Sequence, residues 1–300
     1  SSNIPLRELS TRSFELPDHD KGFTVVCDPG TLATVQEALA LWKNACFQEA
    51  TTEFWDEVAR RGMQCSGPIT GPPVLLFSPC PLLSETVELM ERSLSELRGG
   101  TALRALDLGC GAGRDSVWLA SRSWAVTAVD QSVDRVRALS ERLGVRVDAF
   151  AARIRSNGTV TVPQAKAAPA EVESKAGEQP AWLCAQYDLV LLVRFWERGF
   201  LPCLPALVAP GGFLLIANFV EGVEWFEHPK DPRHFVGAFE LTHGVPPAAV
   251  LKHMPPARRR EADALLKRLQ QQQDGSEGKT KRAEETVAEA GPLKGWRVLV

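Results

Sequence analysis

Apolar positions along this chain alternate between two spacings, one typical of helices and one typical of strands. An apolar stripe at Val87, Met90, Leu94 and Leu97 has helical spacing and ends at Gly99-Gly100, after which an apolar stretch leads into a glycine-rich turn. Further strands are expected at 124–129, 145–152, 187–193 and 212–219, and helical segments from 116, over 132–143 and over 201–208. Strands that alternate with helices pair in parallel, so the pattern predicts an α/β fold with a Rossmann-like, mostly parallel sheet.

The first 83 residues have a pattern of their own. A strand is expected at 23–26, a helix through Val35, Leu39, Trp42 and Cys46, and a second helix through Phe54 that stops at Gly62. Prolines and glycines between 68 and 81 then interrupt the pattern, as expected for a connection between domains. We therefore predict a smaller α/β domain with its linker at 1–83 and a main domain at 84–300.

Two segments of the main domain lack hydrophobic periodicity. Residues 155–179 are rich in Ala, Pro, Lys and Glu, and residues 270–285 contain a run of glutamines followed by Gly, Ser and charges. We predict that these two segments are mobile and removable, and that they belong to insertions near 155–180 and 245–292. The helix expected between the two segments carries Arg258, Arg259, Arg260, Lys267 and Arg268. It is either an arm that contacts RNA or a solvated helix whose charge Glu261 and Asp263 balance.

The strongest chemical signal is the run LDLGCGAGRD at 106–115. It lies between an expected strand and an expected helix, where glycines let the backbone turn sharply and approach a ligand closely. A dinucleotide fingerprint has its third glycine three residues after the second, but here Gly113 follows Gly111 by two and Arg114 stands at the dinucleotide position. Asp130 ends the next expected strand, where such folds place a carboxylate against ribose hydroxyls. These features predict a nucleotide-like ligand in a cleft formed by the turns after 107, 130, 152, 193 and 219.

Residues 84–300, insertions excepted, resemble class I S-adenosylmethionine (SAM) methyltransferases of the tellurite-resistance branch. The resemblance rests on residues 107–116, 129–132, 187–190 with Arg194-Phe195, 209–212, 232–235 and Glu240-Leu241. It implies SAM as the cofactor and methyl transfer to an unidentified acceptor as the reaction. It further implies three parts of a site. The methionine part of SAM is surrounded by Asp107, Gly109, Cys110, Gly111 and Gly113. Asp130 and Gln131 follow the second strand, with Asp130 on the ribose, and Arg194 lies in the loop that closes over substrate.

One position departs from that family. Where relatives carry an acid after the third strand, in contact with adenine, this chain has Ala152-Arg153. A guanidinium cannot accept the hydrogen bond from the exocyclic amine that a carboxylate accepts, so we expect poorer adenine recognition. The backbone groups of Ala152 and Arg153 remain candidate adenine contacts. Asp148 is a weaker candidate to replace the missing acid.

Residues 1–83 resemble the back half of a rhodanese domain, over 3–9, Arg12, 14–17 and 23–27. In that family a cysteine accepts sulfur as a thiolate, activated by loop N–H groups. Asp28 adds negative charge beside Cys27 and Pro29 removes one N–H donor, so we expect Cys27 to be inert. We also expect a fragment at both ends, with the C-terminal strand at 296–300 left without a partner.

Methyl transfer from SAM needs alignment more than a catalytic side chain, so no catalytic residue is assigned. If the acceptor must lose a proton, the candidate bases near the cleft mouth are Glu197, His228 and His234. Two alternatives stay open. One is a SAM-binding scaffold with weak or no catalysis, and the other is a nicotinamide-dependent oxidoreductase, which the glycine spacing disfavours.

Composition limits the partners and the location. A formal net charge of −3 and the lack of an apolar run of membrane length give no general attraction to DNA or to a membrane. Seven cysteines without a Cys-x-x-Cys pair and five histidines without ligand spacing predict neither a disulfide framework nor a metal site. We therefore expect an intracellular, cytoplasmic protein whose methyl acceptor is a small molecule or RNA.

Overall fold

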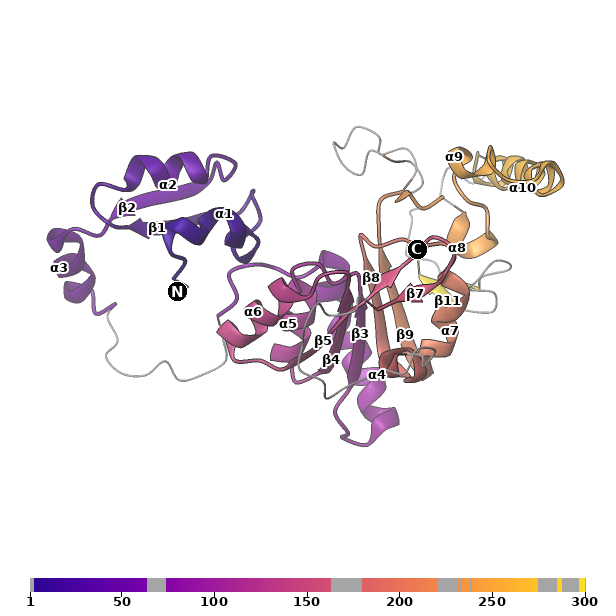
Figure 1. Cartoon of the computed structure of the whole chain (residues 1–300), viewed down its shortest axis with the longest axis horizontal. Helices are drawn as coiled ribbons and strands as arrows, with labels where there is room; N and C mark the ends of the chain where they lie inside the picture. Colours follow the sequence, from indigo (N-terminus) through magenta and orange to yellow (C-terminus); the bar gives the residue numbers. More distant parts are fainter. Residues whose placement is uncertain are drawn as a thin grey trace.

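The computed structural model describes residues 3–63, 74–162, 180–220, 231, 234–237, 239–274, 285–287 and 297–299. Its centre is a five-stranded parallel sheet in the order β5-β4-β3-β8-β9 (Figure 1). The strands are β3 (Arg104–Leu108), β4 (Ala125–Asp130), β5 (Val147–Ala151), β8 (Tyr187–Val193) and β9 (Val208–Ala217). The chain winds outward from β3 to β5 and returns to β8, so the direction of winding reverses between β3 and β8. The predicted α/β fold with a mostly parallel sheet is confirmed.

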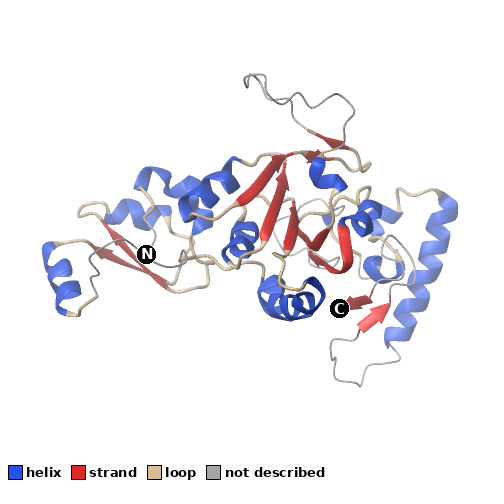
Figure 2. Ribbon diagram, turned by 90° about the horizontal axis from the view of Figure 1, so that it is seen from below, coloured by secondary structure: helices blue, strands red, loops and turns tan. Residues whose placement is uncertain are grey.

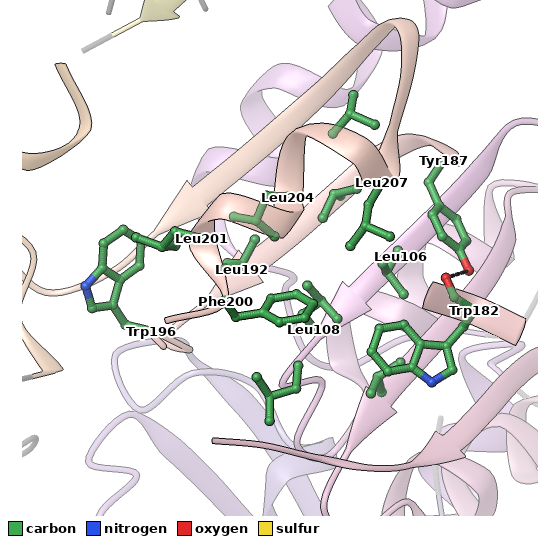
Figure 3. Close-up of a cluster of buried hydrophobic side chains, with 14 of the residues drawn as sticks. Leu106, Leu108, Trp182, Tyr187, Leu192, Trp196, Phe200, Leu201, Leu204 and Leu207 are labelled. Carbon is green, nitrogen blue, oxygen red and sulfur yellow. Dashed lines mark hydrogen bonds between the residues drawn. The ribbon is translucent and has the colours of Figure 1, made fainter. Parts of the chain in front are cut away.

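The central strands β3 and β8 bury both of their faces, which explains their nearly continuous apolar runs in the sequence. One face packs against α4 (Pro81–Arg98) and α5 (Arg114–Ser121) through residues such as Ala105 and Leu191. Residues of α6 (Asp134–Leu143) pack on Ala128, on the same face of the sheet. The opposite face carries η3 (Ala181–Cys184), η4 (Leu201–Cys203) and α7 (Leu204–Leu207), whose side chains form the cluster in Figure 3.

Helix α4 begins and ends where its residues permit. Pro81 stands in its first turn, where a missing N–H is no loss, and Gly99 ends it in the left-handed conformation at φ 59°. Its buried stripe is Leu83, Val87, Met90 and Leu94. Leu97, which the periodicity placed on this stripe, is 59% exposed.

The carboxylate of Asp188, at the start of β8, links three elements. It accepts hydrogen bonds from Arg98 Nε at 2.6 Å and from the Arg104 N–H at 2.9 Å. Arg98 also donates to the carbonyl of Pro210 at 2.9 Å. Because Asp188 is buried and both of its oxygens are bonded, it holds the end of α4 against the sheet.

The N-terminal unit (residues 3–63) lies at the opposite end of the molecule from α10 (Figures 1 and 2). Its elements are η1 (Leu6–Glu8), α1 (Leu9–Arg12), η2 (Ser13–Glu15), β1 (Phe23–Cys27), α2 (Leu32–Ala38), β2 (Ala45–Glu49) and α3 (Thr52–Arg60). Strands β1 and β2 pair in parallel. The helix predicted through Cys46 is wrong: α2 ends at Ala38, and Cys46 pairs with Thr24 in the sheet. Val35, Leu39 and Trp42 do share one core cluster. Their apolar spacing therefore indicated which residues are buried, but not that they lie on one continuous helix.

The segments predicted as insertions are partly ordered. Strands β6 (Arg153–Ile154) and β7 (Val160–Thr161) form a hairpin in which Ile154 belongs to the main core and Val160 packs against it, while most residues of 155–162 are exposed. The hairpin turn also approaches Gly199 closely, because a Cβ on Gly158 would lie 2.3 Å from the Gly199 oxygen. Residues 163–179 lie outside the described residues.

The C-terminal part contains α8 (Glu240–His243), α9 (Ala248–Leu251) and α10 (Pro256–Asp274). Helix α10 includes the start of the second predicted insertion, because Leu269 is buried against Phe239 and Val245 and the glutamine run continues the helix. The rest of that segment, 275–284, lies outside the described residues. Strand β11 (Arg297–Leu299) pairs with β10 (Glu285–Val287), so the expectation of an unpaired C-terminal strand is wrong. None of the described helices has the length and apolar character that crossing a membrane requires.

Candidate functional site

A pocket of about 240 Å³ lies at the carboxyl ends of the central strands. It is lined by Gly109 after β3, by Val129, Asp130 and Gln131 of β4 and its turn, by Ala152, Arg153 and Ile154 after β5, and by Phe195 and Glu197 after β8. Four of the five turns predicted to form one cleft therefore meet here, and the turn after 219 adds no lining residue among those described. We call this cavity the motif pocket.

The predicted site residues divide into two groups. Gly109, Asp130, Gln131, Ala152 and Arg153 line the motif pocket, whereas Asp107, Cys110, Gly111, Gly113 and Arg194 do not. Sequence reasoning did not single out Val129, Ile154 or Phe195 as pocket walls. Their place in the sequence could have identified them, because each stands at the carboxyl end of a strand or just beyond it.

The glycine turn uses its own N–H groups. Gly109, Gly111 and Gly113 have φ values of 73°, 56° and 82°, which side chains other than glycine rarely adopt. The N–H groups of Gly109 and Cys110 donate to the carbonyl of Val129 at 2.8 and 3.2 Å. The Gly113 N–H donates to the Cys110 carbonyl at 2.8 Å. These hydrogen bonds fix the turn on the end of β4 and leave those donors unavailable to a ligand.

Asp130 connects the glycine turn to the pocket. Its carboxylate accepts hydrogen bonds from the Gly111 N–H at 2.9 Å and from the Ser132 N–H at 3.3 Å. Helix α6 begins at Asp134 with Val133 at the cap, two residues after the start predicted at 132, and the backbone of Ser132 bonds to Asp130 instead. The result is a carboxylate held in one orientation at the pocket wall.

Asp107 lies beneath the turn rather than in the pocket. It is 3% exposed, and its carboxyl accepts a hydrogen bond from the Ser116 hydroxyl at 2.5 Å. Burial, together with the charges of Asp115 and Asp130, raises the pKa of Asp107 to about 7. Burial also raises the pKa of Asp115, whose carboxylate accepts the Cys80 N–H at 2.6 Å. Three carboxyl groups therefore surround the glycine turn.

The turn after β8 brings Phe195 over the glycine turn. Arg194 has φ 54°, an uncommon value for an arginine, and this bend carries the chain past the end of the strand. A Cβ on Gly109 would lie 2.4 Å from the Phe195 ring, so only glycine fits beneath it. The Arg194 side chain is exposed and its guanidinium lies 5.8 Å from the centre of the Phe219 ring.

The turn after β5 is held by its own hydrogen bonds. The Ala152 N–H donates to the Asp130 carbonyl at 2.8 Å, so it is not available to a purine. The Arg153 carbonyl lies 3.4 Å from the Thr161 hydroxyl that donates to it across the hairpin. Arg153 is exposed and lines the motif pocket together with Asp130 and Glu197.

The other candidate residues stand apart from the motif pocket, except Glu197. His234 is exposed and does not line it, and His228 lies outside the described residues. A second cavity of about 490 Å³, between η4 and residues 240–254, contains none of the predicted site residues. Among the described residues, no group of His, Cys, Asp or Glu side chains could hold a metal ion.

Cys27 lies at the end of β1 and is buried. Its thiol lies 3.7 Å from the carbonyl of Gln48, to which it donates. The Gly30 N–H donates to the carboxylate of Glu49 at 2.8 Å, so this loop donor does not point at the sulfur. This geometry agrees with the expectation of an inert thiol, which stays a prediction.

Comparison with known proteins places similarity on the segment that carries the glycine turn. Residues 96–152 match the family described as tellurite resistance protein TehB. Over 264 residues the chain is 28% identical to a protein of Schizosaccharomyces pombe described as uncharacterized protein UNK4.09, across 78% of this chain and 76% of that protein.

Solved structures are similar over shorter stretches. TehB from Haemophilus influenzae matches at 18% identity and a TM-score of 0.28, over 43% of this chain and 41% of that chain. A SAM-dependent methyltransferase from Thiobacillus denitrificans, in complex with S-adenosyl-L-homocysteine, matches at 19% identity and a TM-score of 0.30, over 51% of this chain and 52% of that chain. The chain therefore spans about half the length of these proteins or less, and our fold assignment rests on the strand order instead.

Proposed function

We propose that this chain is a SAM-dependent methyltransferase and that the motif pocket holds the nucleoside part of SAM. The observation that carries the proposal is the Asp130 carboxylate, fixed by two backbone N–H groups at the pocket wall beside the glycine turn. A carboxylate accepts hydrogen bonds from both hydroxyls of a ribose. The match of residues 96–152 to the TehB family supports the same cofactor.

The charge around the turn distinguishes SAM from a nicotinamide dinucleotide. A pyrophosphate needs free N–H donors, but those of Gly109, Cys110, Gly111 and Gly113 are already bonded. The carboxylate of Asp130 also makes the pocket wall beside the turn negative, and Asp107, whose pKa burial raises to about 7, adds charge only in part near neutral pH. Such surroundings repel a pyrophosphate and attract the sulfonium and ammonium groups of SAM. Both observations disfavour the oxidoreductase alternative.

The residues present fit the two ends of SAM differently. At about 240 Å³ the motif pocket is smaller than the roughly 300–1,000 Å³ of typical ligand pockets, so it suits the nucleoside end alone. A Cβ on Gly111 would meet no atom within 4 Å, so the backbone there is open to a ligand. Phe195 covers Gly109, and we propose that this ring moves aside for the methionine end.

Bound SAM supplies a methyl group that its sulfonium makes electrophilic. The protein then has to bind SAM and the acceptor, orient them toward each other and exclude water. This positioning accounts for much of the acceleration in reactions of this kind. Asp130 binds the ribose. Glu197, which lines the pocket, is the group that could take a proton from an acceptor that must lose one.

Isothermal titration of the whole chain tests the proposal. We expect SAM and S-adenosyl-L-homocysteine to bind and NAD to give no heat of binding. Binding of NAD without binding of SAM would overturn the proposal and favour the oxidoreductase.

A SAM-binding scaffold is the second candidate function, because Arg153 stands where relatives carry an acid and Cys27 is buried. Release of labelled methyl from SAM, assayed against pools of metabolites, metalloids and RNA, distinguishes the two candidates. Transfer to one pool identifies the class of acceptor, for which we propose a small molecule or RNA. Binding of SAM without transfer to any pool would favour the scaffold.

Arg153→Asp should tighten SAM binding several-fold. The substitution restores an acceptor for the exocyclic amine of adenine at the pocket wall and removes a cation that cannot accept it. Titration with SAM measures the change. Arg155→Asp is the matched control, because Arg155 is also exposed in the same hairpin but does not line the pocket. Weaker binding by Arg153→Asp alone would show that the guanidinium has a role toward ligand.

The interpretation of residues 1–83 as a partial rhodanese-like domain stays a prediction. Its elements are α/β, and β1 and β2 pair in parallel.

A further inference from the structure

We propose that residues 14–18 of the N-terminal unit form a brace that positions the glycine turn for the cofactor. The N-terminal brace, as we call these residues, contacts the start of α5 and one side of α6. These two helices follow the strands β3 and β4 that carry the glycine turn and Asp130. The inference rests on the proposed function, because SAM affinity is its main readout.

The first contact of the brace is to the residue that directly follows the glycine turn. Arg114 donates to the carboxylate of Asp18 at 2.9 Å and to the carbonyl of Ser78 at 2.9 Å. Its guanidinium also lies 5.3 Å from the centre of the Phe77 ring. Because Arg114 is the first residue of α5 and Gly113 caps that helix, its position sets where the turn ends.

The second contact is apolar. Phe14 packs in the cluster formed by Phe77, Val117 of α5 and Leu139 of α6. It therefore joins both helices at a point behind the turn. Helix α6 contacts the turn directly, since a Cβ on Gly113 would lie 2.3 Å from a methyl carbon of Val136, which is three residues from Leu139. A shift of α6 would thus reach Gly113 without an intervening element.

The third contact is an ion-pair network. Glu15 is 6% exposed and accepts hydrogen bonds from Arg12 at 2.7 and 2.9 Å. Arg142, in the last turn of α6, also donates to Glu15. A carboxylate this buried requires partners, so the network fixes the orientation of the brace on α6.

No residue of the brace lines the motif pocket, so its members are positioning residues. They act on the turn through α5 and α6, which are held at Arg114, Val117, Leu139 and Arg142. Loss of the brace should loosen the turn that must present its backbone and Asp130 to SAM. The N-terminal unit would then be a working part of the cofactor site.

The test compares Phe14→Ala and Asp18→Asn with matched controls in α3 of the same unit. Phe54→Ala removes an aromatic ring that contacts Trp55 edge to face, and Asp56→Asn neutralises an exposed carboxylate. We expect Phe14→Ala to weaken SAM binding by about five-fold or more. About five-fold is the lower end of the change in affinity that coupling between two separate sites typically produces. Asp18→Asn should weaken it about two-fold to three-fold, because that ion pair is partly exposed, and Asp18→Glu should restore it. Neither control should change the affinity.

A folded Phe14→Ala variant that binds SAM within two-fold of the natural chain would overturn the proposal. If Phe14→Ala does not fold, the milder Asp18→Asn and its rescue by Asp18→Glu decide instead. If the natural chain does not bind SAM, the proposed function fails, and hydrogen exchange at 109–117 then tests the brace by itself. Faster exchange in Asp18→Asn than in Asp56→Asn would support the brace, and equal exchange would refute it.

Discussion

Replacing Asp130 by alanine should weaken SAM binding by about 1–3 kcal/mol, or roughly 5-fold to 150-fold. Two losses add up. The ribose hydroxyls lose a charged acceptor, and the N–H groups of Gly111 and Ser132 lose the carboxylate that holds them. The turn next to the ligand is then less well ordered before binding. Isothermal titration of the variant with SAM measures the effect.

Asp148→Ala is the matched control for Asp130→Ala. Asp148 lies on the neighbouring strand β5, its side chain is 55% exposed, and it pairs at 3.3 Å with Arg146. It does not line the motif pocket, so the affinity should stay unchanged. Equal affinities of Asp130→Ala and the natural chain would contradict the assignment of Asp130 to ribose.

Asp107→Asn should remove a dependence of folding stability on pH. Burial raises the pKa of Asp107 to about 7, whereas an aspartate in an unfolded chain titrates near 3.8. Between these two values the folded protein holds a proton that the unfolded chain has lost. The free energy of unfolding therefore falls as the pH rises through this window, by up to about 1.4 kcal/mol per pH unit, and is constant above it.

Thermal unfolding between pH 4.5 and 8 measures this effect. Since 1 kcal/mol corresponds to roughly 2–4 °C in a protein of this size, the total change should be several degrees. The natural chain should lose stability toward pH 8 more steeply than Asp107→Asn. The slope of stability against pH is compared, and not the stability at one pH, because the amide also changes the hydrogen bond to Ser116. Some slope should remain in the variant, since burial also raises the pKa of Asp115. Asp148→Asn should keep the natural slope, and parallel curves for the natural chain and Asp107→Asn would exclude a buried, protonated Asp107.

Local patterns predicted the parts of this protein that depend on neighbouring residues. The alternation of strands and helices gave the parallel sheet, and the glycine spacing placed a turn at the end of β3. Burial of both faces shows directly as apolar runs, and positive φ values demand glycine. The predicted strand at 187–193 coincides with β8.

The errors occur where contacts between distant segments decide the conformation. Cys46 has the spacing of a helix with Val35 and Leu39, but pairing with β1 makes its segment a strand. Residues 155–162 look like the start of an insertion, but they complete a hairpin with residues 153–154, in which Val160 packs against the main core that contains Ile154. The glutamine run continues α10, whose Leu269 is buried against Phe239 and Val245.

By itself, then, the sequence determined the sheet, the glycine turn and the positions of Asp107 and Asp130, because backbone conformation and periodic burial are encoded within a few residues. Only the tertiary structure decided which of these residues line a pocket. It turned Asp107 away from the pocket and toward Ser116, placed Phe195 over Gly109, and engaged the N–H groups of the turn. It also set Phe14 and Asp18 against the helices behind that turn. The physical reason is that such contacts join segments far apart in the chain, and the spacing of residues within one segment does not indicate which distant segment it contacts.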